Sequence, residues 1–448
     1  MTHNTYSVNR FPWTTSLAIG IHLMTGGSLF GNSPDPEEFD HRKHLSTLHV
    51  GVLFNDDEVQ IRFKFPTDWP VWYHQYRVFR NGTWVRYGDA SDGPDPHGFY
   101  EDRISMMLDD GSVPHFANAG GFVTAHSGMR SLDSAADPEE VSKNPHLGVN
   151  LGRDEVRKFI SPSREGFPGR ESWKRVRSQE ELEKLLDEGI FIDLWQWRAH
   201  RSHPVGYSDN GYILEYRHAS EGRGMYTGNW DEEAGQPAWM YDPERSGLRA
   251  LRFEKLKARA YGQDDPYYLS EEDAIPFDPD HEWEEGDAIP DRLLQSPSGS
   301  RGAIRASGGY RDGAWHVRLT RSLESPNLRD SKALKKGERY SVAFAVHTRG
   351  AGQRYHHVSL PRTLGLGVDA DITGRYVESG PLDDAEVEWV DLTLFYPGQV
   401  TWDWLLSEHP GSFMVESDAL NISFHSIEEL RRYVLEHEAE IRARNQDR

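Results

Sequence analysis

The sequence predicts a mainly β protein, an immunoglobulin-like β-sandwich with long loop insertions and a small C-terminal extension that ends in a helix. Short segments in which apolar and polar residues alternate recur along the chain, as in strands with one buried face. Between them stand turn residues, drawn from 41 Gly and 25 Pro. Finally, 19 Phe, 14 Trp and 19 Tyr provide large side chains for a sizeable core.

The first strands are expected at Leu17 to Leu23, Thr47 to Phe54 and Glu58 to Phe65. Asn55, Asp56 and Asp57 are typical turn residues, so the second and third of these segments should form a hairpin. Glu101 to Leu108 is predicted as the next strand. We expect the sandwich to occupy residues 1–366 and the extension residues 367–448.

Two insertions are expected in the sandwich, at about 131–190 and 218–301. The first contains a helix that Ser178 and Glu181 would begin with a capping box and Gly189 would end. The second is rich in Asp, Glu, Gly and Pro, which is typical of a solvated surface loop. The alternative for the second insertion is a docking surface for a basic partner.

Later strands are predicted at residues 211–217, 314–323, 339–347, 355–360 and 386–396. A second capping box, formed by Ser426 and Glu429, predicts the terminal helix.

Charge and cysteine content exclude several classes of function. The net charge of −22 would repel a phosphate backbone and an anionic membrane. The absence of cysteine excludes disulfides, thiolate metal sites, iron–sulfur ligation and thioether-linked haem. The apolar run at 16–30 is too interrupted for a membrane span or a signal peptide, so we expect a cytoplasmic chain with no membrane span.

Two stretches are the most distinctive: AGGFVTAHSGM at Ala119 to Met129 and DLWQWRAHRSHPVGYSD at Asp193 to Asp209. With the EDRI-type strand at Glu101 and the closing segments WHVRLTRSL, YSVAFAVH and RYHHVSLP, they resemble the haem-binding electron-transfer subunits related to the gamma subunit of ethylbenzene dehydrogenase. Relatives of that subunit serve dimethyl sulfide dehydrogenase, chlorate reductase and nitrite oxidoreductase. The resemblance covers scattered blocks between residues 10 and 366.

The resemblance implies a haem site that has lost its covalent links. Family members with covalent haem carry Cys-x-x-Cys-His where this chain has Phe122-Val123-Thr124-Ala125-His126. A second motif of this kind leaves only His425, in Asn421-Ile422-Ser423-Phe424-His425. Because iron is held by axial ligands rather than by thioethers, non-covalent haem b stays compatible with the chain. The alternative is a former site now filled by packing.

Relatives with haem b use a Met and a Lys as axial ligands. The matching segment here, Arg354 to Ser359, has no Lys, so His356 or His357 would substitute. Candidate methionines are Met106, Met107 and Met129. We expect His126 and His356 as the first pair, with His357 or Met129 as second partners; a purely structural histidine is the alternative at each position.

The Trp-rich block, Asp193 to Asp209, could supply contacts to the edge of the haem. Arg198, Arg201 and His203 are expected to meet propionates, near Trp195. Alternatively, Trp195 and Trp197 belong to the core with arginines stacked on them.

The resemblance therefore predicts a non-catalytic electron-transfer subunit with haem b, partnered by a molybdopterin catalytic subunit and an iron–sulfur subunit. It also places such proteins outside the cytoplasm, carried there by a partner. The alternative from another class is a haem-free β-sandwich, either a carbohydrate-binding-like module or a structural subunit. A metal hydrolase is a weaker reading, because no HExxH motif occurs.

Overall fold

The computed structural model describes residues 45–88, 99–126, 128–130, 135–167, 171–350 and 356–395. The strand expected at 17–23, the helix expected from Ser426 and the candidate ligand His425 lie outside these residues. Within them, strands dominate and helices are short, so the mainly β class is confirmed.

Thirteen strands of the described chain form one large sheet, the main sheet. They are β1 Leu45–Phe54, β2 Glu58–Pro66, β5 Arg103–Asp109, β6 Ile192–Arg198, β7 Tyr207–Ile213, β8 Arg217–Ala219, β16 Ile304–Arg311, β17 Ala314–Ser322, β18 Arg339–His347, β19 His357–Val358, β20 Arg362–Leu366, β21 Ile372–Tyr376 and β22 Val390–Phe395.

The main sheet closes on itself. Its strands follow the order β19-β22-β1-β2-β17-β16-β7-β6-β5-β18-β20-β21, and further pairings join β19 to β18 and β1 to β21. The enclosed core takes alternate residues of several strands, for example Ile104, Met106 and Leu108 of β5. Trp195 and Trp197 of β6 enter the same core and are fully buried.

Local signals in the sequence correctly placed several elements. Asn55 turns the β1–β2 hairpin, because its Oδ1 accepts hydrogen bonds from the backbone N–H groups of Asp57 and Glu58 at 2.9 and 2.8 Å. The predicted capping box is confirmed: Ser178 and Glu181 exchange both hydrogen bonds at the start of α4, Gln179–Asp187.

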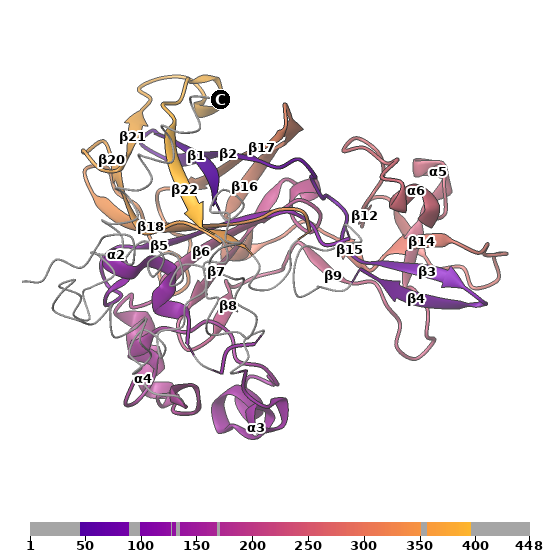
Figure 1. Cartoon of the computed structure of the whole chain (residues 1–448), viewed down its shortest axis with the longest axis horizontal. Helices are drawn as coiled ribbons and strands as arrows, with labels where there is room; N and C mark the ends of the chain where they lie inside the picture. The colour runs from indigo at the N-terminus through magenta and orange to yellow at the C-terminus, as the bar shows by residue number, and fades with distance from the viewer. Residues whose placement is uncertain are drawn as a thin grey trace, which may run out of the picture.

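The acidic insertion is not a solvated loop. Together with residues 69–88, residues 226–294 form a second body, the side unit, which Figure 1 shows beside the main sheet. Its own core contains Tyr73, Tyr76 and Tyr241, all at most 1% exposed. The sequence prediction was wrong here because the acidic residues lie between aromatic ones, and the aromatic residues supply the burial.

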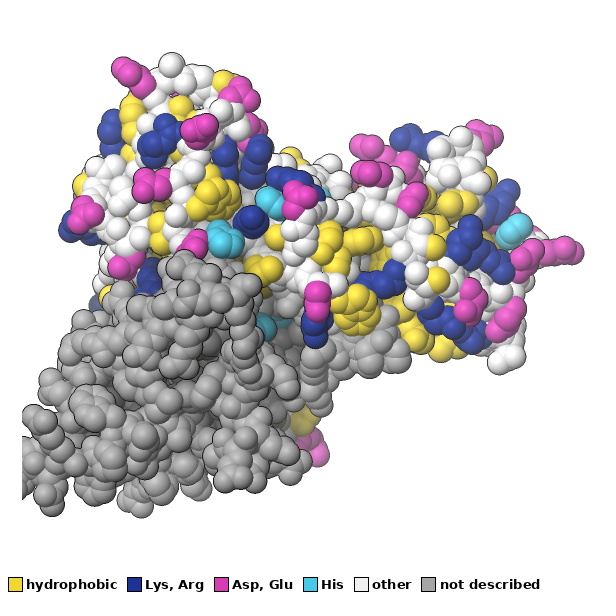
Figure 2. Space-filling view, turned by 45° about the horizontal axis from the view of Figure 1, so that its top comes forward, with side chains coloured by type: hydrophobic (Ala, Val, Ile, Leu, Met, Phe, Trp, Pro, Cys, Tyr) yellow, Lys and Arg dark blue, Asp and Glu magenta, His cyan; other side chains and the backbone are white. Residues whose placement is uncertain are grey.

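The side unit is built from short elements. They are β3 Tyr76–Arg80, β4 Thr83–Tyr87, β9 Tyr226–Gly228, β10 Trp239–Tyr241, β11 Leu251–Arg252, β12 Leu269–Ser270, β13 Ala274–Pro276, β14 Asp287–Pro290, β15 Arg292–Leu294, α5 Pro243–Ser246 and α6 Phe253–Lys257. On the face visible in Figure 2, Lys and Arg are interspersed with Asp and Glu, so the negative charge does not form one continuous patch there.

The first insertion carries the remaining helices. They are α3 Pro138–Lys143, η3 Pro145–Asn150, η4 Ser161–Ser163, η5 Ser172–Lys174 and α4; α2 Phe116–Ala119, η2 Gly120–Thr124, η6 His203–Val205, η7 Gly299–Gly302 and η8 Leu382–Asp384 occur elsewhere. Among the described residues, no helix is long and apolar enough to span a bilayer.

Residues after 366 also contribute to the main sheet. The sequence assigned them to a separate extension, yet β21 pairs with β20 and β1, and β22 pairs with β1 and β19. The expected boundary at 366 therefore falls inside the main sheet.

Candidate functional site

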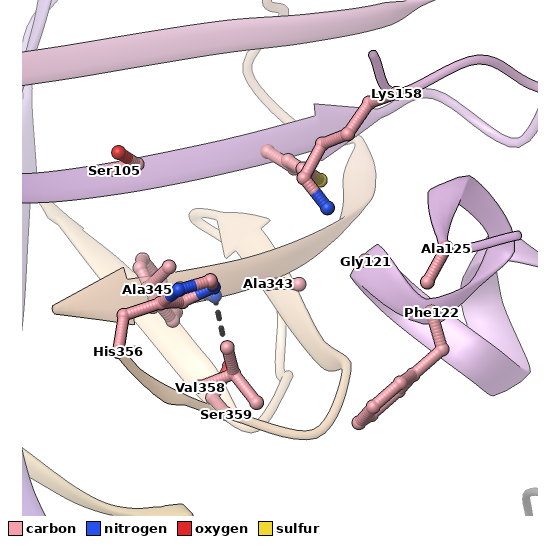
Figure 3. Close-up of a pocket in the computed structure, with 12 residues that line it drawn as sticks. Ser105, Gly121, Phe122, Ala125, Lys158, Ala343, Ala345, His356, Val358 and Ser359 are labelled. Carbon is pink, nitrogen blue, oxygen red and sulfur yellow. Dashed lines mark hydrogen bonds between the residues drawn. The ribbon is translucent and has the colours of Figure 1, made fainter. Parts of the chain in front are cut away.

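A pocket lies on the face of β5 and β18 that points away from the enclosed core. The empty space in and around it is about 470 Å³, part of which is open solvent. The residues around it come from five separate segments: Ser105, Met107, Gly121, Phe122, Ala125, Lys158, Ala343, Phe344, Ala345, His356, Val358 and Ser359. Figure 3 shows Phe122 and Ala125 on one side of the pocket and His356 on another.

Strand register explains the floor of the pocket. Met107 is paired with Ala343 and Ser105 with Ala345, so these four residues share one face of the sheet. Three of them are small, which leaves room above the strands. Gly121 of η2 comes close to the sulfur of Met107, since a Cβ added to this glycine would lie 3.4 Å from Sδ.

One hydrogen bond holds the edge of the pocket that follows His356. The backbone N–H of Phe344 donates to Oγ of Ser359 at 2.8 Å, drawn as the dashed line in Figure 3. This bond fixes the segment after His356 against β18. His356 itself is 6% exposed and stacks on His347, with ring centroids 4.4 Å apart. Its neighbour His357 is in β19 and is not among the pocket residues.

The residues that match the haem-attachment motif do not all face the pocket. Phe122 and Ala125, at the two cysteine positions, line the pocket. His126 does not: its Nε2 is 3.1 Å from the carbonyl oxygen of Arg157, and its ring stacks on Phe159 with centroids 3.5 Å apart. The structure thus does not bring His126 and His356 into one pocket.

The three candidate methionines have different surroundings. Met107 lines the pocket, whereas Met106 is 1% exposed in the enclosed core. Met129 is 5% exposed, forms an isolated β-bridge with Val156 and is not a pocket residue. Met107 is therefore the methionine whose sulfur can reach a ligand in the pocket.

The sequence analysis missed Lys158, which also lines the pocket. Its Nζ donates a hydrogen bond to Oγ1 of Thr124 at 3.0 Å. Burial, reinforced by the nearby charge of Arg217, lowers the pKa of Lys158 to about 8. No motif or periodic pattern marks this lysine, because it is one of many charged residues in the first insertion.

The aromatic residues of the Trp-rich block are packed inside the protein. Trp195 is fully buried in the enclosed core, with the guanidinium of Arg321 4.4 Å from its ring centroid. His203 packs edge-on against Trp197 at 5.3 Å, and burial lowers the pKa of His203 to about 4. These positions agree with core packing, and they face away from the pocket.

The two arginines of the block are already paired. Arg198 is 2.7 Å from Asp209, and Arg201 is 2.6 Å from Glu101. Gln196 connects Arg198 to the pocket residue Ser105. Nε2 of Gln196 donates a hydrogen bond to Oγ of Ser105 at 2.9 Å. Its Oε1 accepts hydrogen bonds from Arg198 at 2.5 Å and from Arg217 at 2.6 Å.

The described residues give less support to the two other functions considered, a metal hydrolase and a carbohydrate-binding module. No group of three or more His, Asp or Glu side chains there is arranged to hold a metal ion. The tryptophans of the Trp-rich block are in the core, so they offer no face for stacking on a sugar ring.

The chain is similar in sequence to known proteins. Over 75 residues the chain is 35% identical to a cytochrome c-552 from Stutzerimonas stutzeri, covering 17% of this chain and 25% of that protein. The chain thus spans a quarter of the length of this curated relative. The family described as ethylbenzene dehydrogenase matches residues 24–359, three quarters of the chain. The chain therefore belongs to the ethylbenzene dehydrogenase family, as the motifs in its sequence predicted.

Proposed function

We propose that the chain is a non-catalytic electron-transfer subunit that binds haem b, non-covalently, in the pocket between β5, β18 and η2. The observation that carries the proposal is the shared pocket of Met107, His356, Phe122 and Ala125. A thioether sulfur, an imidazole and the two residues that match the cysteine positions of the haem-attachment motif thus surround one space.

The residues present fit such a group. Most of the lining is apolar or small, with few polar groups to fix orientation. Thioether sulfur and imidazole nitrogen are the axial ligands of many electron-transfer haems. Absence of cysteine restricts the chain to non-covalent binding.

Each residue has a distinct role in the proposal. Met107 and His356 would hold the iron, and His347 orients the His356 ring by stacking on it. Phe122 and Ala125 keep water from the edge of the pocket. The haem, when bound, supplies reversible one-electron oxidation and reduction.

The partners in this proposal are the catalytic subunit of a molybdoenzyme and its iron–sulfur subunit. Membership of the family supports them. We further propose that the complex works outside the cytoplasm and that a partner carries this chain there.

The test is to purify the full chain with haem supplied and record absorption spectra of its oxidised and reduced forms. We expect a Soret band, with α and β bands that sharpen on reduction. His356→Ala should lose the six-coordinate spectrum, whereas His357→Ala should keep it because His357 does not line the pocket. A colourless wild-type protein would refute the proposal.

The same spectra test the ligand pair expected from sequence. His126→Ala should leave the haem spectrum unchanged, because this ring is packed against Phe159. Loss of iron ligation in His126→Ala, with His356→Ala unaffected, would restore His126 as a ligand and remove His356.

A further inference from the structure

One hydroxyl group at the floor of the pocket has its hydrogen-bonding direction fixed by the residue behind it. Ser105 of β5 lines the pocket (Figure 3) and is 8% exposed. Its Oγ accepts a hydrogen bond from Nε2 of Gln196 at 2.9 Å. Among the described residues, no atom accepts a hydrogen bond from the O–H of Ser105 in return. This O–H is therefore available to a ligand.

The amide of Gln196 has a single favourable orientation. Its Oε1 lies 2.5 Å from Nη2 of Arg198 and 2.6 Å from Nη2 of Arg217. A guanidinium group has donors and no acceptor, so the atom that faces two of them must be the carbonyl oxygen. The NH2 group of Gln196 then faces Ser105 and donates to it. The hydrogen of the Ser105 hydroxyl thus has to find an acceptor elsewhere.

The two guanidinium groups also strengthen this donor. They polarise the amide of Gln196, and a chain of hydrogen bonds that all run in one direction passes part of this polarisation to the O–H at its end. A negatively charged acceptor gains most from such a donor. The hydroxyl of Ser105 is therefore suited to an anionic group rather than to a neutral one.

Strand register places Ser105 beside the candidate iron ligand Met107. Ser105 is paired with Ala345 and Met107 with Ala343, on the same face of the sheet. Two residues of a strand span about 7 Å. A porphyrin whose iron is held by Met107 would thus bring its edge close to Ser105.

We propose that Ser105 donates a hydrogen bond to a carboxylate side chain of the porphyrin and that Gln196 fixes the direction of this bond. The contact rests on the proposed function, since it needs haem in the pocket. The two carboxylates are the anionic acceptors at the edge of haem b. Arg198, expected from the sequence to meet a propionate itself, would act through Gln196. Ser105 and Gln196 are positioning residues, because they hold the ligand by its edge and leave the iron to other side chains.

The experiment titrates the full-length protein with ferric haem and with the dimethyl ester of haem, followed by the Soret band. Iron ligation is common to the two ligands, so a difference between them reports on the carboxylates. Ser105→Ala should weaken binding of haem about ten-fold and binding of the ester less than about two-fold, with the Soret maximum unchanged. Ser105→Thr keeps the O–H and should bind haem as wild type does.

Ser208→Ala is the matched control. Ser208 of β7 is a fully buried serine of the same sheet that does not line the pocket. Its replacement should leave the affinity for both ligands unchanged.

Gln196→Glu tests the direction of the hydrogen bond. The introduced carboxylate accepts from both arginines but cannot donate, so the hydrogen of Ser105 would turn toward it and away from the pocket. This variant should by itself bind haem more weakly. Ser105→Ala added to Gln196→Glu should then weaken haem less than about two-fold further. The added charge cancels in this comparison, because both proteins carry it.

The outcomes separate the contact from the function on which it rests. If Ser105→Ala weakens haem and ester equally, or weakens neither, the carboxylate contact is refuted while haem binding stands. A ten-fold effect of Ser105→Ala in the Gln196→Glu protein would refute the role of Gln196. If neither haem nor its ester binds the folded wild-type protein, the proposed function is refuted and the contact with it.

Discussion

Met106 and Met107 are consecutive residues of β5 whose side chains occupy opposite faces of the main sheet. Met106 is 1% exposed inside the enclosed core, next to Ile104 and Leu108 in the same cluster. Met107 lines the pocket on the other face. The two-residue repeat of a strand thus gives two identical side chains different environments.

This pair provides a matched test of the haem site. Met107→Ala should lose methionine ligation, with haem affinity reduced about ten-fold or more and little change in the stability of the haem-free protein. Met106→Ala should destabilise the protein by about 2–5 kcal/mol, because it leaves a cavity in the core, and should keep the haem spectrum. Urea unfolding and haem titration measure both effects. If Met107→Ala binds haem with an unchanged spectrum, the sulfur is not an iron ligand.

Restoring the two cysteines should restore covalent attachment. In Phe122→Cys/Ala125→Cys, both thiols would face the pocket, and under reducing conditions with haem supplied we expect thioether bonds to the porphyrin. Haem that stays with the chain on a denaturing gel is the measurement. Val123→Cys is the control, because Val123 is buried beside the pocket without lining it. Haem that binds the double variant and is wholly released on denaturation would place the porphyrin edge elsewhere.

Asp102 should make stability depend on pH. This buried carboxyl accepts hydrogen bonds from Nε1 of Trp315 at 2.8 Å and from the backbone N–H of Val71 at 3.0 Å, yet burial dominates and raises its pKa to about 7. A raised pKa means that the folded state binds the proton more tightly than the unfolded state. The free energy of unfolding should therefore fall as the pH rises from about 4 to about 7.

The measurement is the urea midpoint across that pH range. Asp102→Asn, which cannot ionise, should show a flatter profile than wild type even if it is less stable throughout. An identical slope in both proteins would mean that other groups set the pH dependence.

The ion pair between Arg321 and Asp193 should matter more than its surface counterparts. Both side chains are fully buried and 2.7 Å apart. Arg321→Met leaves the charge of Asp193 without its partner and should cost about 3–5 kcal/mol of stability, while Arg321→Met/Asp193→Asn should recover part of it. The exposed pair of Arg318 and Asp383 is the control, with a cost below about 1 kcal/mol for Arg318→Met. Equal losses from the two single changes would contradict this account.

Sequence patterns predicted those parts of the fold that depend on neighbouring residues. The β1–β2 hairpin follows from Asn55 and two alternating strands, and α4 follows from Ser178 and Glu181. Phe122, Ala125 and His356, which the family motifs singled out, all line the pocket. These signals are local in the chain, so they are readable without knowledge of the tertiary structure.

Other features depend on contacts between distant segments. Lys158 lies beside η2, where its Nζ donates a hydrogen bond to Thr124, and no residue pattern indicates this contact between separate segments. Met107 could not be separated from Met106 until the register with β18 was known. The side unit was misjudged for a similar reason, since its core joins residues 69–88 to residues more than a hundred positions later.

The pocket walls also determine when a cofactor can enter during biogenesis. Ser105, Phe122 and Lys158 leave the ribosome long before His356 and Ser359, and β18 must pair with β5 before the floor exists. A cofactor that binds here could therefore be enclosed only after β18 and the segment from His356 to Ser359 have been synthesised.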